Sequence, residues 1–102
     1  MSFALPEHLE VLHQPVRLAV VTVLHRQPSM TFGELRKSTD VTAGNLASHL
    51  DRLAHDGLVR QRRIFGKDGL QTRVLLTPVG AARFQEYLAF LRAYLDGQGA
   101  RA

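Results

Sequence analysis

A chain of 102 residues with 45% hydrophobic content is long enough for one globular domain with a small core. The absence of cysteine excludes disulfides and thiolate metal ligands and is compatible with a reducing compartment, so we expect a cytoplasmic protein. The formal net charge is +4, and the basic excess lies in the second half, because residues 1–51 hold four Lys/Arg against five Asp/Glu whereas residues 52–102 hold nine against four. This asymmetry indicates an anionic partner such as a nucleic acid backbone.

The first half of the chain predicts two helices. Apolar residues recur at three- and four-residue spacing after Pro15, which suits a first helical position, and this helix is expected to end near His25. A break follows. Thr31 and Glu34 then have the spacing of a capping box, which opens a short second helix that runs to about Ser38.

A third helix has clear signals at both ends. Thr42 is a good N-cap, and Gly57 can adopt the left-handed conformation that closes a helix. Counting back from Gly57 places Leu53 and Leu58 at the two positions whose apolar contact accompanies a Schellman cap.

The rest of the chain predicts a hairpin and a last helix. Residues 58–65 and 70–77 read as two strands, and residues 66–69, which contain two glycines, form the turn between them. Thr77 followed by Pro78 predicts the start of a helix that runs to about residue 95. The expected order is therefore helix, short helix, helix, basic hairpin, helix.

The chain resembles the small winged helix-turn-helix transcriptional regulators related to the MarR and ArsR families. The resemblance is carried by the segments HQPVRLAVVTVL, TFGELRKSTDVTAGNLASHLDRLAHDGLV and TRVLLTPVG, which together span about residues 12–91. It implies an α+β, mainly α, winged helix-turn-helix with a three-helix core and a two-stranded β wing. We expect a single domain over residues 1–102, with its core at about 12–77 and terminal dimerisation segments at about 3–13 and 78–95.

In the third helix, leucines 46, 50 and 53 fall on one face, which we expect to contact the core, and the opposite face is short and polar. The resemblance implies that this recognition helix, residues 42–56, enters the major groove and that residues near its start read base edges. Gly44 either admits a phosphate to free backbone N–H groups or is simply tolerated in a first turn. The alternative for the whole face is an ordinary solvated surface. The candidate contacts are Thr42, Gly44, Asn45, Ser48, His49 and Arg52.

The wing, residues 60–73, is basic, and the resemblance implies that it lies along the DNA backbone with its tip toward the minor groove. Strand alternation places Arg60 and Arg62 on one face and Arg63 on the other, so these arginines cannot all contact the same duplex. We favour Arg62, Lys67 and Arg73 over Arg60, and Arg63 remains a candidate. A solvated, charged edge is the alternative.

The last helix carries more apolar surface than a small core covers, and we expect it to form a two-fold homodimer with the amino-terminal segment. The alternative is that it packs only on the first helix. The expected interface residues are Leu5, Leu9, Leu12, Phe84, Tyr87, Leu88, Leu91, Tyr94 and Leu95, with Phe3 and Phe90 beside them.

The sequence predicts neither an enzyme nor a metal or cofactor site. It has no Gly-rich phosphate loop and no nucleophile motif, and its histidines lack ligand spacing, since His8 and His13 are five apart and His49 and His55 are six apart. The longest apolar run, residues 18–21, is far too short to cross a membrane, and we expect no targeting segment.

We therefore expect a sequence-specific regulator of transcription, a repressor, that binds double-stranded DNA as a homodimer at an inverted repeat. The resemblance also allows a small-molecule effector, unknown from the sequence, between the terminal helices and the core. A winged-helix module that binds protein and not DNA is the alternative from another class. Duplex RNA fits less well, because its deep, narrow major groove does not admit a helix.

Overall fold

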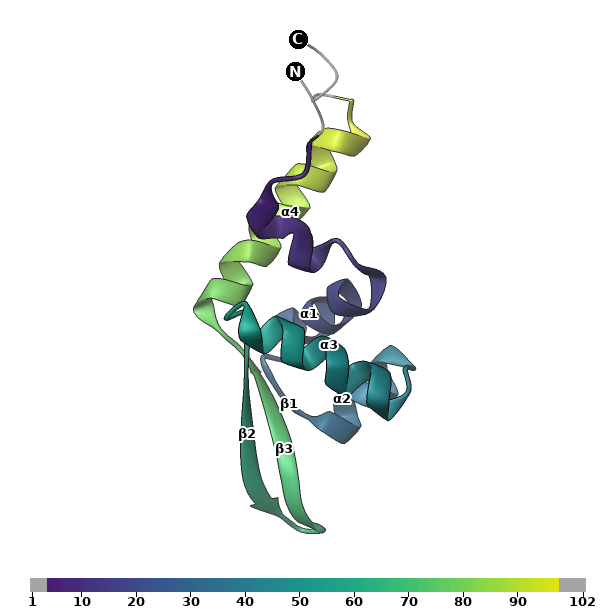
Figure 1. Ribbon diagram of the computed structural model, residues 1–102, viewed down its shortest axis with the longest axis vertical. Helices are drawn as coiled ribbons and strands as arrows, with labels where there is room; N and C mark the ends of the chain where they lie inside the picture. The colour runs from purple at the N-terminus through teal and green to yellow at the C-terminus, as the bar shows by residue number, and fades with distance from the viewer. Residues whose placement is uncertain (1–3, 98–102) are drawn as a thin grey trace.

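The computed structural model describes residues 4–97, so Phe3 of the expected dimer segment lies outside the described residues. Figure 1 shows three helices, α1, α2 and α3, gathered at the middle of a long molecule, with a β hairpin extending one way and α4 the other. The extents are 56 × 24 × 21 Å. The elements are a 3₁₀ helix η1 (Glu7–Leu12), α1 (Pro15–Arg26), β1 (Ser29–Thr31), α2 (Phe32–Thr39), α3 (Ala43–His55), β2 (Val59–Gly66), β3 (Gly69–Leu76) and α4 (Pro78–Leu95).

The predicted signals at the start of α2 and at the end of α3 are confirmed. Thr31 Oγ1 accepts from the Glu34 N–H at 3.1 Å and the Thr31 N–H donates to Glu34 Oε1 at 2.8 Å, which completes the capping box. Gly57 has φ 81°, and the N–H of Leu58 donates to the carbonyl oxygen of Leu53 at 2.9 Å. Both leucines are buried, so the Schellman cap forms as predicted.

The sheet has three strands in the order β1-β3-β2, whereas the sequence predicted two. Residues 29–31, placed in or beside the expected break, pair antiparallel with β3, and Met30 lies opposite Val74 with both side chains buried. Three residues carry no periodicity of their own, and β1 forms because the edge of β3 offers it hydrogen bonds and an apolar neighbour.

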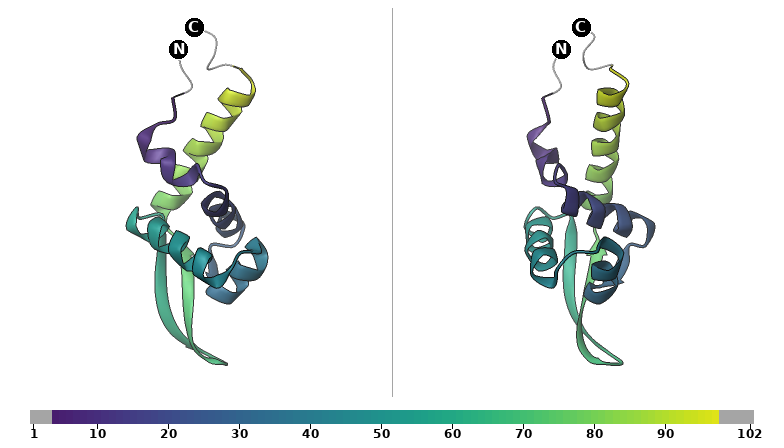
Figure 2. Two further views of the ribbon diagram at one scale, coloured as in Figure 1. Left: turned by 45° about the vertical axis from the view of Figure 1, so that its right-hand side comes forward. Right: turned by 90° about the vertical axis from the view of Figure 1, so that its right-hand side faces the viewer.

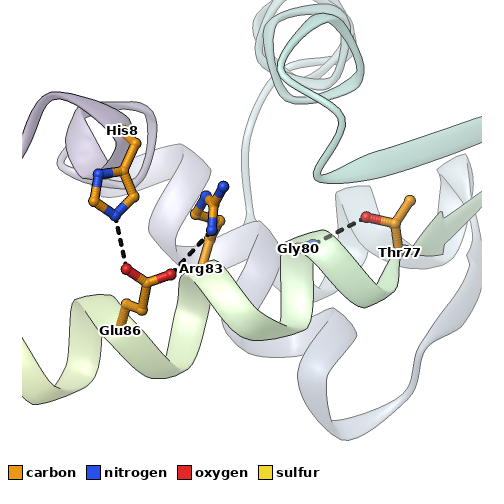
Figure 3. A network of polar contacts seen from close by, with 5 residues as sticks. All are labelled: His8, Thr77, Gly80, Arg83 and Glu86. Carbon is orange, nitrogen blue, oxygen red and sulfur yellow. Dashed lines mark hydrogen bonds and ion pairs between the residues drawn. The ribbon is translucent and has the colours of Figure 1, made fainter.

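The amino-terminal segment was not predicted to be helical, yet it forms η1 and packs on α4. Its buried side chains, Leu9, Val11 and Leu12, belong to the same apolar core as the leucines of α1, α2 and α3. His8 Nε2 lies 2.7 Å from Glu86 Oε2 of α4, and Arg83 Nη1 donates to the other oxygen of that carboxylate, Oε1, at 3.0 Å (Figure 3). Figure 2 shows η1 and the middle of α4 side by side.

The start of α4 is joined tightly to the end of α3. Thr77 Oγ1 accepts from the Gly80 N–H at 2.9 Å, as Figure 3 shows, and the Thr77 hydroxyl lies 3.0 Å from the carbonyl oxygen of Leu58. A Cβ on Gly80 would overlap that same carbonyl oxygen, so only glycine lets the two elements approach this closely. The joint fixes the direction in which α4 leaves the core.

Candidate nucleic-acid interface

The first half of α3 presents a polar face to solvent. Thr42 caps the helix by accepting from the Asn45 N–H at 3.2 Å, and Gly44, Asn45 and Ser48 are exposed. Across residues 4–97, the Asn45 amide and the Ser48 hydroxyl have no side-chain hydrogen-bond partner. Leu46 and Leu50, both fully buried, hold the opposite face on the core. The helix is therefore anchored from behind while its amide and hydroxyl groups remain available to a ligand.

His49 is turned away from this polar face. Its Nδ1 lies 3.1 Å from Nη1 of Arg17 on α1, and Arg17 Nε donates to the carbonyl oxygen of Val11 at 2.6 Å. Burial of the imidazole and the nearby Arg17 guanidinium lower the pKa of His49 from its ordinary value. The structure therefore brings His49 to α1 and not to Asn45 and Ser48, with which the sequence had grouped it.

Arg52 also leans to the side of α3 that carries η1. Its Nε lies 3.3 Å from Asp56 Oδ2, and the same hollow is lined by Glu7, His8 and Glu10. An exposed ion pair of this kind contributes little to stability and is easily exchanged for another partner. Arg52 is therefore paired with Asp56 and lies beside the acidic residues of η1, Glu7 and Glu10.

Asp51 and Gln61 connect α3 to the wing, a contact that the sequence reasoning missed. Gln61 Nε2 of β2 donates to Asp51 Oδ1 at 3.1 Å. Strand alternation places Arg63 on the same face of the sheet as Gln61, and thus on the side that carries α3. The sequence allowed Asp51 to be predicted as an exposed residue of α3. Its partner Gln61 could not be predicted, because it lies ten positions away in another element.

Arg62 and Arg73 lie on the opposite face of the wing. They are register partners in the β2–β3 ladder, and Arg73 Nη1 donates to Ser29 Oγ of β1 at 3.0 Å. Like charges directly opposite each other repel, so this pair favours an anion beside it. Lys67 is exposed at the turn, and Arg60 is exposed near the base of the hairpin. The structure thus divides the predicted basic residues between two faces and the tip.

Two further cations lie on α2 and were not among the predicted contacts. Arg36 and Lys37 are exposed in its last turn, beside a hollow of about 330 Å³ that Gly33, Asp40 and Val41 also line. The first helix of a helix-turn-helix crosses the sugar-phosphate backbone. The adjacent pair of cations just before the turn is the sequence signal that could have identified them.

The expected dimer residues separate into two groups. Leu9, Leu12, Phe84 and Tyr87 are buried in the core of the single chain, so their side chains are already covered. Leu5, Leu88 and Leu91 are half-buried, and Tyr94 and Leu95 at the far end of α4 are 50% and 78% exposed. Only the second group offers apolar surface to a partner.

Four of the five histidines, His8, His13, His25 and His49, make contacts between elements. His13 Nδ1 lies 2.8 Å from the Tyr87 hydroxyl, and His25 packs on the Phe84 ring with centroids 4.9 Å apart. Within residues 4–97, no three His, Asp or Glu side chains gather in a way that could hold a metal ion. None of the helices in that range has the combined length and apolar character needed to cross a bilayer.

The chain is similar in sequence and structure to known DNA-binding proteins. A family model described as a winged helix DNA-binding domain matches residues 16–95. The structure of a transcriptional regulator homologue from Pyrococcus horikoshii is 31% identical, with a TM-score of 0.81 over 87% of this chain and 88% of that one. The transcriptional repressor BigR from Xylella fastidiosa is 28% identical, with a TM-score of 0.66 over 82% and 81% of the two chains. A mutant MarR from E. coli, complexed with operator DNA, is 26% identical, with a TM-score of 0.68 over 90% and 66%.

Proposed function

This chain belongs to the winged helix DNA-binding domain family. We propose that it is a sequence-specific regulator of transcription that binds double-stranded DNA and acts as a repressor. The observation that carries the proposal is the polar face of α3, where Asn45 and Ser48 are exposed beside a wing tied to the same helix by Gln61 and Asp51. The repressor named among its structural relatives supports the direction of regulation.

Base reading is assigned to the amino-terminal half of α3. An α-helix fits the major groove, about 12 Å wide, and the small side chains at Gly44 and Ser48 let this one approach the floor of the groove. Asn45 has the donor and acceptor pair that binds adenine in a bidentate way. Thr42, which caps the helix, stands where a phosphate meets the positive helix end.

Sequence-independent affinity is assigned to cations around that helix. Arg36 and Lys37 of α2 stand on one side, and Arg63 and Lys67 of the wing on the other. Arg62 and Arg73 concentrate positive charge on the second face of the wing. Each phosphate that these side chains neutralise releases a condensed counterion, so affinity falls steeply as salt rises.

The assembly we propose is a homodimer through the carboxy-terminal half of α4. The interface combines the exposed Tyr94 and Leu95 with the uncovered parts of Leu5, Leu88 and Leu91, which also pack against the core. Two-fold pairing would set two recognition helices about one helical turn apart, roughly 34–36 Å. The preferred site is then an inverted repeat with half-sites about 10 base pairs apart.

The experiment is a selection of bound duplexes from a random pool, followed by affinity measurements on the selected and a random duplex across a salt series. We expect an inverted repeat to be enriched and the affinity for both duplexes to fall by about 10³-fold or more between 50 and 200 mM salt. Transcription from a promoter that contains the selected site should decrease when the protein is added.

A module that binds protein and not DNA is the second candidate, favoured by one observation: α4 leaves Leu95 78% exposed at its far end. The same experiment separates the two functions. Absence of binding to any duplex at low salt would favour the protein-binding module and contradict the proposed function.

A further inference from the structure

The tip of the wing carries an apolar pair that no part of the core covers. Phe65 on β2 is 87% exposed and Leu70 on β3 is 53% exposed, and the two are register partners next to the last pair before the turn. Figure 1 shows that this end of the hairpin extends beyond α2 and α3. An exposed aromatic ring on an edge strand favours aggregation, so the presence of Phe65 there needs a physical explanation.

Phe65 lies on the face of the wing that carries α3. Residues 59, 61, 63 and 65 alternate onto one side of β2, and Gln61 on that side is bonded to Asp51 of α3. Four residues of strand place Phe65 about 13 Å beyond Gln61 along the hairpin. The ring is therefore directed to the same side as the recognition helix, but well past it.

A purely local role does not account for the ring. A cross-strand pair near a turn stabilises a hairpin, and Phe65 opposite Leu70 makes such a pair. However, a ring that is 87% exposed covers little of its partner, and a β-branched residue would favour the strand equally well. The stability of the hairpin therefore explains an extended conformation at position 65 but not an aromatic side chain there.

The charges around the pair select the partner. Arg63 lies two residues before Phe65 on the same face, Lys67 is exposed at the turn, and Arg62 and Arg73 lie on the other face. Asp68 beside Lys67 is the one acidic side chain in residues 60–73. A second wing would meet this surface with like charges, whereas phosphates on both sides of a groove complement it.

We propose that Phe65, supported by Leu70, is an apolar wedge that enters the minor groove next to the major groove occupied by α3 and partly unstacks one base step. Apolar side chains that insert between base steps bend the duplex, and the cost is lowest at flexible pyrimidine–purine steps. The wedge thereby adds a sequence preference at positions that α3 does not touch. This inference rests on the proposed function, since it requires that the chain binds duplex DNA.

The test uses the full chain and a duplex enriched from the random pool, with 2-aminopurine placed in turn at each adenine flanking the inverted repeat. Wild-type protein should raise the fluorescence at one flanking step, which reports unstacking. Phe65→Thr keeps the strand preference but removes the ring, and should lose that signal and bind about 10-fold more weakly or worse. Phe65→Tyr keeps the ring and should retain both properties.

Three outcomes overturn the wedge. If Phe65→Thr matches wild type in affinity and fluorescence, the wedge is wrong while DNA binding stands. If wild type binds but raises the fluorescence at no position, the ring does not unstack a base step, even where Phe65→Thr binds weakly. If wild type binds no duplex at all, both the proposed function and the wedge are wrong. Circular dichroism on both variants shows whether they are folded, so that a loss of affinity or fluorescence is interpreted only for folded protein.

Discussion

The arginines of this chain differ in what holds them, and this decides what each can do. Arg17 is drawn inward, where it donates to the Val11 carbonyl oxygen and contacts His49. Arg73 is fixed by Ser29, and Arg52 is paired with Asp56. Arg63 and Lys67 are exposed, and neither side chain has a hydrogen-bond or ion-pair partner within residues 4–97. A count of basic residues therefore overstates the number that are ready to contact a phosphate.

Base reading and backbone contact should separate in single substitutions. Asn45→Ala or Ser48→Ala should weaken binding to the selected duplex more than to a random one, with about 1–3 kcal/mol of discrimination lost per good base contact. Arg62→Ala or Lys67→Ala should weaken both duplexes alike, because phosphates carry no sequence. Affinities from fluorescence anisotropy at one salt concentration give the comparison. Equal losses on both duplexes for the α3 variants would place the reading residues elsewhere.

The contact between His49 and Arg17 should make stability depend on pH. Arg17 donates to Nδ1, so His49 must be neutral, and burial followed by the Arg17 charge lowers its pKa from 6.5. As the pH falls through 6.5, the unfolded chain takes up a proton at this position before the folded chain does. The free energy of unfolding therefore decreases on acidification, and the loss is complete only below the folded pKa.

His49→Gln, which retains an acceptor but does not titrate, is the matched variant. Urea unfolding of both proteins from about pH 7.5 down to about pH 5.5 should show wild type losing stability relative to the variant. Every other residue is common to the two proteins, so its contribution cancels in the difference. Parallel curves for the two proteins would mean that His49 does not resist protonation in the folded chain.

At the scale of elements, the joint between α3 and α4 determines how the recognition helix and the terminal helix are connected. Thr77 caps α4 and also contacts the carbonyl oxygens of Gly57 and Leu58, so one hydroxyl serves the end of one helix and the start of the next. The close approach at Gly80 brings α4 onto Leu58 and Leu76. A change at this joint should therefore affect the whole fold and not α4 alone.

Gly80→Ala should destabilise the protein by about 1–3 kcal/mol, because the added methyl group must displace the Leu58 backbone. Gly33→Ala is the control: Gly33 is also in a helix, but a Cβ there meets nothing within 4 Å, so the change should be neutral or stabilising by about 0.5–1 kcal/mol. Thermal unfolding followed by circular dichroism measures both. Similar midpoints for the two variants would show that the joint tolerates a shift.

At the scale of the whole molecule, the wing and α4 extend from opposite sides of the core, as Figures 1 and 2 show. Two-fold pairing through α4 would leave both wings and both copies of α3 free at the other side. The 56 Å length of the chain suits that division, with one end for assembly and the other for DNA.

Leu95→Asp should convert the proposed dimer to a monomer that binds the selected duplex weakly, since a charge in an apolar interface is strongly unfavourable. Leu95 is 78% exposed in the single chain, so the substitution should leave the fold intact. Ala89→Asp adds the same charge at an exposed position on the other side of α4 and should remain dimeric. Light scattering gives the mass, and wild type that scatters as a monomer at high micromolar concentration would contradict the dimer.

Features that depend on neighbours within a few residues could be predicted from residue type and spacing. The capping box at Thr31 and Glu34, the Schellman cap at Gly57 and the proline start of α4 each form from groups at most five positions apart. Their hydrogen bonds follow from local backbone geometry, so residue type and spacing suffice to predict them. The order of these elements predicted three helices, a hairpin and a last helix, and the resemblance to the MarR and ArsR families identified that order as a winged helix.

Contacts between residues that are distant in the chain depend on how the elements pack and could not be predicted in this way. Strand β1 exists because β3 lies beside it, with Ser29 and Arg73 44 positions apart in the chain. The packing of η1 on α4 likewise depends on distant residues. So does the orientation of His49, whose side chain contacts Arg17 of α1 although its position on α3 would also allow it to point toward solvent. Helical periodicity states which side of a helix a residue occupies, but the side chain turns toward whichever partner the other elements bring within hydrogen-bond distance.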